Sequence, residues 1–551
     1  MKRIFRVAQL TSVFVLAALL SLPAIGFSQT VPRGPAALHK PDPIKEELLE
    51  HMSQILQGRR LAAQHLSSRL NRKGQVGPVE DLFNKDNVGF PQNEESVTVC
   101  KNKPDIVEGG TNDYRGLLDP QGNFTGWYLS TNGGDSVRNE GLLPPVRAAN
   151  GQLLPSGGDP VSQSDEDCNI YMLSLNYPAE DPFQGPNGVA LYKSTPQRLA
   201  SCPQGEDPNR LTHPVCWPQR RLVAQAQVLG GAGRFLDKPW MDVGQSGQAG
   251  NVVWVVYSDF VINAQAPLGF TAAQIKAVRC TADLRTCTNP ILISGADQDV
   301  QFGDVTISET GRTLITWSEI QGELQQKPQT FVIKARVAPP GSTQFGPTHV
   351  VARETLPMGF GDKLHSNDFR IATYPKSIMP SVNGHERIYV TWDRCRARVP
   401  SLIAEFSCEE GEILLSHSND LGRTWSKPRR ISLEGDNYFP AISDEVGNPN
   451  FVIAYYTNRF DRVFHNQQDV ELLTLDAASG RVKHRERVTK LSNETEADPL
   501  LGGVFIGDYF DVHLLRGTAY VHYNANYRHI RVLGEGFPIP QQDNYLTKVR
   551  S

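Results

Sequence analysis

The chain has 551 residues, a formal net charge of −4 and 39% hydrophobic residues, which supply enough apolar material for a large core. Its cationic residues are not gathered into one run, so the sequence lacks the basic footprint of a nucleic-acid-binding protein. The 47 glycines and 38 prolines are dispersed along the chain. This distribution favours many short strands joined by turns over long helices.

The N-terminus has the pattern of a secretory signal peptide. Lys2 and Arg3 precede an apolar run over residues 13–25, and small residues follow at 26–28. The apolar run is too short for a comfortable membrane span, and no second one follows. We therefore predict a signal peptide over residues 1–28 and a secreted or periplasmic protein without a transmembrane span. The alternative is an uncleaved N-terminal anchor, which also exports the main body.

The eight cysteines agree with export, because an even count in an exported chain indicates disulfides. Three sequential pairs close short loops and the last two cysteines pair by elimination, while the sequence alone leaves the connectivity open. Neither close C-x-x-C pairs nor nearby histidines suggest a metal site. The predicted pairs are Cys202–Cys216, Cys280–Cys287, Cys395–Cys408 and Cys100–Cys168.

Residues 29–89 are predicted to form a leader and a helix. Residues 29–42 are rich in proline, Asp42 suits a helix N-cap and Pro43 suits the first turn. Apolar residues then recur at helical spacing over 44–70. We expect this helix to dock on the main domain, and the alternative is a helix that binds a partner or dimerises.

From residue 90 onward, short runs rich in Val, Ile, Tyr, Trp and Thr lie between Gly, Asn, Asp and Pro clusters, which predicts strands. The runs recur at roughly 55 to 80 residues, as expected when one small antiparallel sheet repeats with long insertions. This pattern predicts one all-β propeller over residues 90–551. A β-helix would show much shorter repeats, and two sandwiches would show a linker near the middle. The predicted strand openings are Ser96-Val97, Pro160-Val161, Trp240-Met241, Asp304-Val305, Pro380-Ser381, Pro440-Ala441 and Asp508-Tyr509.

The segment from Ser418 to Trp425 fits the pattern Ser-x-Asp-x-Gly-x-Thr-Trp at every specified position. Its chemistry is that of a hairpin turn. Asp420 can accept hydrogen bonds from backbone N–H groups, and Gly422 can take a positive φ at no steric cost. Ser418 and Thr424 can bond across the turn, and Trp425 can pack beneath it.

This motif resembles the Asp-box repeat of the sialidase-like superfamily. The resemblance implies a propeller of six blades in which such turns lie on the rim, away from the central funnel, whereas the seven openings favour seven blades. Weaker copies of the motif occur at Ser130–Val137, at Thr281–Thr286 and at Ser194–Pro196, where an insertion interrupts the turn. Other phrases similar to those of such secreted bacterial proteins are Asn93-Glu94-Glu95-Ser96, Asp237-Lys238-Pro239-Trp240 and Gly507-Asp508-Tyr509.

The resemblance also implies a reaction. Enzymatic sialidases hold the substrate carboxylate with three arginines and use a Tyr nucleophile activated by a Glu, with an Asp as acid/base. Their first arginine normally lies in a Phe/Tyr-Arg-Ile-Pro motif before the first Asp box. Here Tyr114-Arg115 lacks the Ile-Pro, while Phe369-Arg370-Ile371 is followed by Ala372 and lies late in the chain. The arginine motif of active sialidases is therefore not intact.

Polar residues at strand ends are the candidates for a site in the funnel. The alternative for each is a turn cap or a paired, solvated charge. The predicted catalytic residues are Asp237, Tyr456 and Asp508, and the predicted substrate-binding residues are Arg115, Arg370, Arg459 and Arg528.

The sequence therefore predicts a secreted, sialidase-like propeller that acts on carbohydrate or a glycoconjugate, as a glycoside hydrolase. The alternative is a non-catalytic propeller that binds glycan or protein at the cell surface, since propellers host both. The chain has no P-loop, H-E-x-x-H or G-x-S-x-G motif, and no cofactor is predicted. Calcium at Asp297-Gln298-Asp299 is an alternative to a solvated turn.

Overall fold

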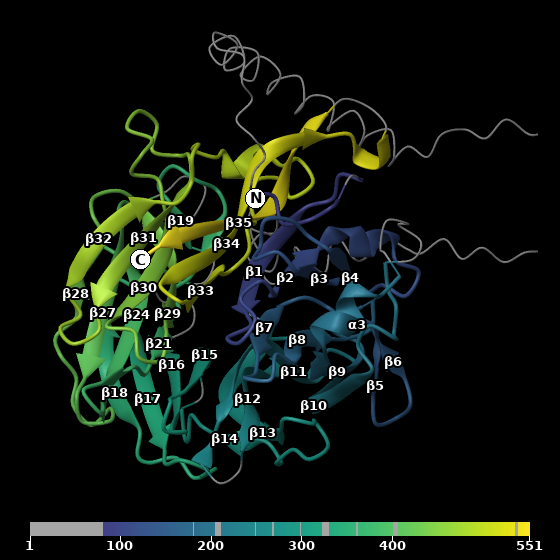
Figure 1. Ribbon diagram of the computed structural model, residues 1–551, viewed down its shortest axis with the longest axis horizontal. Helices are drawn as coiled ribbons and strands as arrows, with labels where there is room; N and C mark the ends of the chain where they lie inside the picture. The colour runs from purple at the N-terminus through teal and green to yellow at the C-terminus, as the bar shows by residue number, and fades with distance from the viewer. Residues whose placement is uncertain are drawn as a thin grey trace, which may run out of the picture. The chain divides into compact units, whose positions relative to one another are not determined.

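The computed structural model describes residues 81–551 with short gaps at 87, 180, 204–210, 248–249, 267–268, 298, 322–329, 360–361, 401–405 and 535–537. The predicted signal peptide and the predicted helix lie outside the described residues. Regular structure in the described part is almost entirely β (Figure 1). No helix in these residues is long and apolar enough to cross a membrane.

The first half of the described chain forms antiparallel sheets whose strands follow one another in chain order (Figure 1). A hairpin joins the last strand of the second sheet to the first strand of the third, so these two sheets are continuous. The strands are β1 (Gln92–Val99), β2 (Val107–Asp113), β3 (Thr125–Ser130) and β4 (Asn139–Leu142); β7 (Val161–Ser164), β8 (Ile170–Asn176), β9 (Gly185–Ser194) and β10 (Gln219–Leu229); β11 (Ala232–Gln245), β12 (Asn251–Asn263), β13 (Phe270–Thr281) and β14 (Ile291–Leu292).

The second half repeats the same plan. Its strands are β15 (Val300–Ile307), β16 (Thr313–Gln321), β17 (Thr330–Ala338) and β18 (His349–Glu354); β21 (Lys376–Ile378), β24 (Ile388–Cys395), β27 (Gly411–Ser418) and β28 (Arg429–Arg430); β29 (Asn437–Asp444), β30 (Asn450–Thr457), β31 (Asp469–Asp476) and β32 (Val482–Arg487); β33 (Asp511–Leu515), β34 (Thr518–Ile530) and β35 (Ile539–Arg550).

Shorter elements decorate these sheets. A four-stranded sheet joins the segment before the fifth repeat to a loop inside that repeat. The elements are β19 (Asp362–Leu364), β20 (Arg370–Ile371), β25 (Arg398–Pro400) and β26 (Phe406–Cys408); β5 (Val146–Arg147) and β6 (Leu153–Leu154); β22 (Ser381–Val382) and β23 (His385–Glu386); helix α3 (Pro196–Ala200); and the 3₁₀ turns η1 (Tyr114–Leu118), η3 (Thr495–Ala497) and η4 (Val532–Gly534).

The first strands of the repeats pack against one another in a closed succession. In the described residues, β1 contacts β7, β7 contacts β11, β11 contacts β15, β15 contacts β21, β21 contacts β29, β29 contacts β33, and β33 contacts β1. A succession of antiparallel sheets that closes on itself is a β-propeller, so the predicted fold class is confirmed. The ring favours seven blades over six, and the blade count stays a prediction.

Both ends of the described chain meet in one sheet. Leu82 forms a β-bridge with Tyr545, and the Phe83 backbone N–H donates to the Asn544 carbonyl at 2.9 Å. Residues 81–83 therefore extend the last sheet beyond β35, so its outer edge is supplied by the earliest described part of the chain.

Apolar side chains fill the spaces between neighbouring sheets. Trp254 on β12, Trp317 on β16 and Trp392 on β24 are fully buried and belong to such clusters. Each lies on a second strand with alternating β-branched residues, as the Val-x-Val-x-Trp pattern predicts. Burying each of these aromatic side chains contributes about 2 to 3 kcal/mol to the free energy of unfolding.

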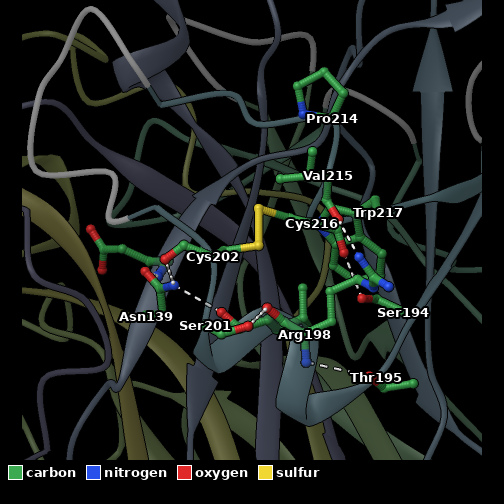
Figure 2. Close-up of a disulfide and its surroundings, with 12 residues drawn as sticks. Asn139, Ser194, Thr195, Arg198, Ser201, Cys202, Pro214, Val215, Cys216 and Trp217 are labelled. Carbon is green, nitrogen blue, oxygen red and sulfur yellow. Dashed lines mark hydrogen bonds between the residues drawn. A yellow bond between two sulfur atoms is a disulfide. The ribbon is translucent and has the colours of Figure 1, made fainter.

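All four predicted disulfides are present. Figure 2 shows Cys202–Cys216, which holds the insertion that follows β9. The insertion contains α3, capped by Thr195, whose hydroxyl accepts from the Arg198 N–H. The Asn139 side chain on β4 donates to the carbonyls of Leu199 and Cys202, which ties the insertion to the first sheet (Figure 2).

The turn from Ser418 to Trp425 has the hydrogen bonds that its sequence predicts. Asp420 Oδ1 accepts from the Thr424 N–H at 2.9 Å, and the Gly422 N–H donates to Ser418 Oγ at 2.9 Å. Gly422 has a φ of +83°. The Trp425 indole N–H donates to the Gly422 carbonyl at 3.0 Å. The turn joins the third strand of its sheet, β27, to the fourth, β28.

The segment at Ser130 repeats this arrangement between β3 and β4. The Gly134 N–H donates to Ser130 Oγ at 2.9 Å, and the Ser136 N–H donates to Asn132 Oδ1 at 3.1 Å. Asn132 therefore performs the role of Asp420 without a charge.

One predicted strand opening is misplaced. Pro380-Ser381 belongs to the small hairpin β22–β23, whereas the first strand of that sheet is β21, Lys376–Ile378. The error arises because Pro380 resembles Pro160, which precedes β7, and Pro440, which lies within β29, but Pro380 itself follows β21.

Candidate functional site

The first strands are distorted at equivalent places near the centre of the ring. Glu94, Lys238, Phe302 and Phe439 have φ values between +49° and +60°, and each lies where the pairing register of its strand shifts. Asp159, just before β7, has a φ of +53°. A left-handed conformation costs a non-glycine residue about 1 kcal/mol or more, and such strain concentrates at functional sites. Bulges also redirect side chains.

Five charged residues form what we call the central cluster: Glu94, Asp159, Lys238, Arg370 and Asp508. Lys238 Nζ lies 2.7 Å from Asp508 Oδ2, and Arg370 Nε donates to Asp508 Oδ1 at 2.8 Å. The Asp508 backbone N–H donates to Glu94 Oε1 at 3.2 Å. Residues far apart in the chain thus meet around one carboxylate.

Burial and charge set the protonation of the cluster. Burial alone would raise the pKa of Asp508, but Arg370 and Lys238 hold it at about 2. Burial, together with the charge of Asp508, raises the pKa of Glu94 to about 7. Burial and the charges of Glu94 and Asp237 raise the pKa of Asp159 well above its ordinary value. Neighbouring carboxyls with pKa values pushed apart are the arrangement that acid–base catalysis uses.

Three buried polar atoms around the cluster have no hydrogen-bond partner within the described residues: Glu94 Oε2, Tyr114 Oη and Tyr374 Oη. Tyr374 is 7% exposed and feels the charges of Asp508 and Arg370. Buried polar atoms are nearly always hydrogen-bonded in folded proteins. Water or a bound molecule with a hydrogen-bonding group would complete the bonding of Tyr374 Oη.

Aromatic rings support the two cations. Arg370 lies 4.5 Å from the Phe505 ring centroid, and Lys238 lies 5.6 Å from that of Phe302. Phe302 in turn packs edge-on against Tyr374. Cation–π contacts of this kind hold the charged groups in fixed positions.

The structure brings together three of the residues predicted for the site. Arg370 and Asp508 are directly bonded. Asp237 is half-buried, accepts from the Lys238 N–H at 2.8 Å and acts electrostatically on Asp159.

The other predicted residues are engaged elsewhere. Arg115 is 3% exposed and bonded to Asp113 and Glu140 within the first sheet. Arg459 Nε donates to Glu471 at 2.9 Å, and Arg528 Nη1 donates to Asn84 at 3.2 Å.

Tyr456, predicted as a nucleophile, is fully buried. Its ring packs against Phe510 at 4.4 Å, and its hydroxyl accepts from the Asn524 N–H at 3.2 Å. Its predicted role, like those of Arg115, Arg459 and Arg528, stays a prediction.

Sequence reasoning did not select Glu94, Asp159, Lys238 or Tyr374. A signal for three cluster members was nevertheless present, because the phrases around Glu94, Lys238 and Asp508 were singled out as weak family marks. The first two phrases lie at the bulges of β1 and β11, and the third immediately precedes β33.

No group of three or more His, Cys, Asp or Glu residues arranged to hold a metal ion occurs in the part of the chain that the structure describes. Calcium binding at the loop Asp297-Gln298-Asp299 was an alternative in the sequence analysis. In the structure, Asp297 forms an ion pair with Lys334 at 2.7 Å.

No protein-family model matches the sequence, and no curated protein sequence matches it. Solved structures with a similar arrangement include a protein of unknown function from Dyadobacter fermentans, with a TM-score of 0.44 and 9% identity over 71% of this chain and 93% of that one. An α-L-arabinanase of Penicillium chrysogenum complexed with arabinobiose has a TM-score of 0.41 and 12% identity, covering 73% of this chain and 98% of its own. The Trypanosoma rangeli sialidase in complex with sialic acid has a TM-score of 0.37 and 11% identity, covering 74% and 56%. The reaction must therefore be argued from side chains.

Proposed function

We propose that this protein is an exported glycoside hydrolase that works at the central cluster. The observation that carries the proposal is that two half-buried carboxyls, Asp159 just before β7 and Asp237 on the adjacent strand β11, interact electrostatically. Burial and the neighbouring negative charges raise the pKa of Asp159 well above its ordinary value, which favours its protonated form beside a second carboxyl group. Glycosidic bond hydrolysis commonly uses such a pair, one group as acid and the other as nucleophile or base.

Each group of the cluster has a role in this proposal. Asp159 gives its proton to the leaving oxygen, and Asp237 acts on the anomeric carbon directly or through water. Lys238 and Arg370 bind an acidic or hydroxyl group of a terminal sugar, and Asp508 fixes their positions. Export agrees with the four disulfides, which form in oxidising compartments.

The test is turnover of fluorogenic glycosides, including sialosides and α-L-arabinofuranosides, by the purified chain. Asp159→Asn removes the proton donor and should lower kcat by about a hundredfold or more. The matched control is Asp135→Asn, the same change in the exposed turn between β3 and β4, which should leave kcat unchanged. Equal activity of the two variants would contradict the role of Asp159.

A second candidate is a non-catalytic propeller that binds glycan. It is favoured by the ion pairs that Asp508 makes with both Lys238 and Arg370, which fix the two cations in position for binding without requiring a reaction. Glycan binding that is measurable by calorimetry, weakened by Arg370→Ala and accompanied by no turnover across the panel, would support this candidate over the hydrolase.

A further inference from the structure

Lys376 and Asp304 face each other across the first strands of two neighbouring sheets. Lys376 begins β21 and Asp304 lies in β15, and Lys376 Nζ is 3.7 Å from Asp304 Oδ1. Lys376 is 9% exposed and Asp304 is 3% exposed. The amine lies over the ring of Trp240, and the Tyr509 ring centroid is 5.9 Å away. An amine and a carboxyl group are thus held together where little water reaches.

Burial shifts both groups toward their neutral forms, so a fraction of the Lys376 amine is uncharged near neutral pH. Burial lowers the pKa of Lys376 to about 8, against the opposing charges of Asp304 and Asp511. Burial likewise raises the pKa of Asp304, although the charge of Lys376 opposes this. A neutral amine is a nucleophile and a protonated carboxyl is an acylating partner, so these are the species that condense to an amide.

The carboxyl group of Asp304 is also oriented for attack. Its Oδ2 accepts from the Ser377 backbone N–H at 2.9 Å and from the Ser377 hydroxyl at 2.6 Å, while Oδ1 faces the amine. Two fixed donors on one oxygen stabilise the negative charge that develops there in a tetrahedral intermediate. The other oxygen is then the leaving group.

A third acid, Asp511 on β33, acts electrostatically on both partners. Burial raises its pKa to about 7. A carboxyl group with such a pKa can accept a proton and return it near neutral pH.

We propose that Lys376 and Asp304 form an intramolecular amide bond. The neutral Nζ attacks Cγ of the protonated Asp304 carboxyl, so an N–C bond forms and the C–Oδ1 bond breaks. Asp511 takes a proton from the nitrogen and delivers it to the departing hydroxyl, which leaves as water. The reaction needs no oxidant, metal or cofactor. Its product links β15 to β21 covalently and removes a poorly paired buried lysine and carboxyl group.

Mass spectrometry of the reduced, trypsin-digested wild-type protein tests the bond. The expected result is one branched peptide that contains both Asp304 and Lys376 and is lighter by one water molecule than its two parts. Lys376 should also resist cleavage by trypsin. Recovery of the unlinked Asp304 and Lys376 peptides as the main products would overturn the proposal, and this readout requires no variant to fold.

Variants sharpen the assignment. Asp304→Asn should still cross-link but lose ammonia in place of water, whereas Asp304→Ala should leave Lys376 unlinked. Asp511→Asn should slow or abolish linkage while keeping the shape of the side chain. The matched control is Lys334→Ala, which removes another lysine paired with carboxylates and should leave the cross-link intact. A branched peptide that persists in Asp304→Ala would assign the bond to another carboxyl group and overturn this one.

Discussion

Asp508 is bonded to Arg370 and Lys238 while it is itself almost completely buried. Removing it leaves two cations without their shared partner in a place where water compensates poorly. We expect Asp508→Ala to lower the free energy of unfolding by about 3 kcal/mol, the usual size for breaking a buried pair. Chemical denaturation measures this directly.

The matched control for that experiment is Asp135→Ala, because the carboxyl group of Asp135 is exposed and its ion pair with Lys548 lies on the surface. We expect a change within about 0.5 kcal/mol there. Equal losses in the two variants would mean that the ion pairs of Asp508 do not stabilise the fold.

At the residue scale, sequence could predict polar strand ends but could not rank them. Arg115 and Arg370 look alike in sequence. Arg115 forms an ion pair with Asp113, only two residues away, whereas Arg370 forms one with Asp508, which is distant in sequence and is brought close by closure of the propeller. Glu94 and Lys238 reach the centre because of left-handed bulges, which are backbone features without a clear sequence signal.

The turn from Ser418 to Trp425 gives a test at the scale of one element. An alanine Cβ at Gly422 would meet Trp425 and Val337 only at ordinary contact distances of 3.6 Å, so the cost arises from the positive φ alone. We expect Gly422→Ala to lower the free energy of unfolding by about 1 kcal/mol.

The control is Gly346→Ala, at a glycine for which no positive φ is found and whose added Cβ would lie 3.4 Å from the Val337 carbonyl. This change should be close to neutral. A Gly422→Ala protein as stable as wild type would show that the turn relaxes into another conformation at little cost.

Elements with strong local patterns were predictable. The strands β12, β16 and β24 were located by alternating β-branched residues that end near a buried Trp. Three disulfides were paired correctly from their short loops and the fourth, Cys100–Cys168, by elimination. The strand β21 was missed because it is short and its pairing with β24 is set across an intervening hairpin.

For the whole molecule, buried acids should make stability depend on pH. Burial raises the pKa of these acids in the folded state above the pKa in the unfolded state, so the folded state binds protons more tightly. Their contribution to the free energy of unfolding is therefore lost as the pH rises through the folded-state pKa. The acids with a pKa of about 7 are Glu94, Asp242, Asp299, Asp393, Asp436 and Asp511.

Four imidazoles oppose this trend, because burial lowers the pKa of His417 and His529 as well as those of His513 and His522. Burial lowers the pKa of His513 and His522 to about 4. Their contribution to the free energy of unfolding is lost as the pH falls below the pKa of a free imidazole. Since the acids outnumber them, we expect a higher thermal unfolding midpoint at pH 5 than at pH 8, measured by calorimetry at constant ionic strength. A midpoint that is higher at pH 8 would mean that the acids are more solvated than their burial indicates.

The propeller itself could be predicted, because a repeat of short strands survives in sequence even when the insertions differ. The order in which strands meet in space could also be inferred from the repeat. The central cluster could not be predicted from the sequence, because it depends on which residue of each first strand faces the middle of the propeller.

The sheet that residues 81–83 share with β35 has a consequence for how the chain folds as it is synthesised. The segment that completes this sheet is synthesised before β1, and its partner strand is synthesised after all the other described strands. Until the ribosome has finished β35, the early segment has no edge to occupy, and the ring remains an open arc with two exposed edges. Closure of the ring therefore requires that β35 has already been synthesised.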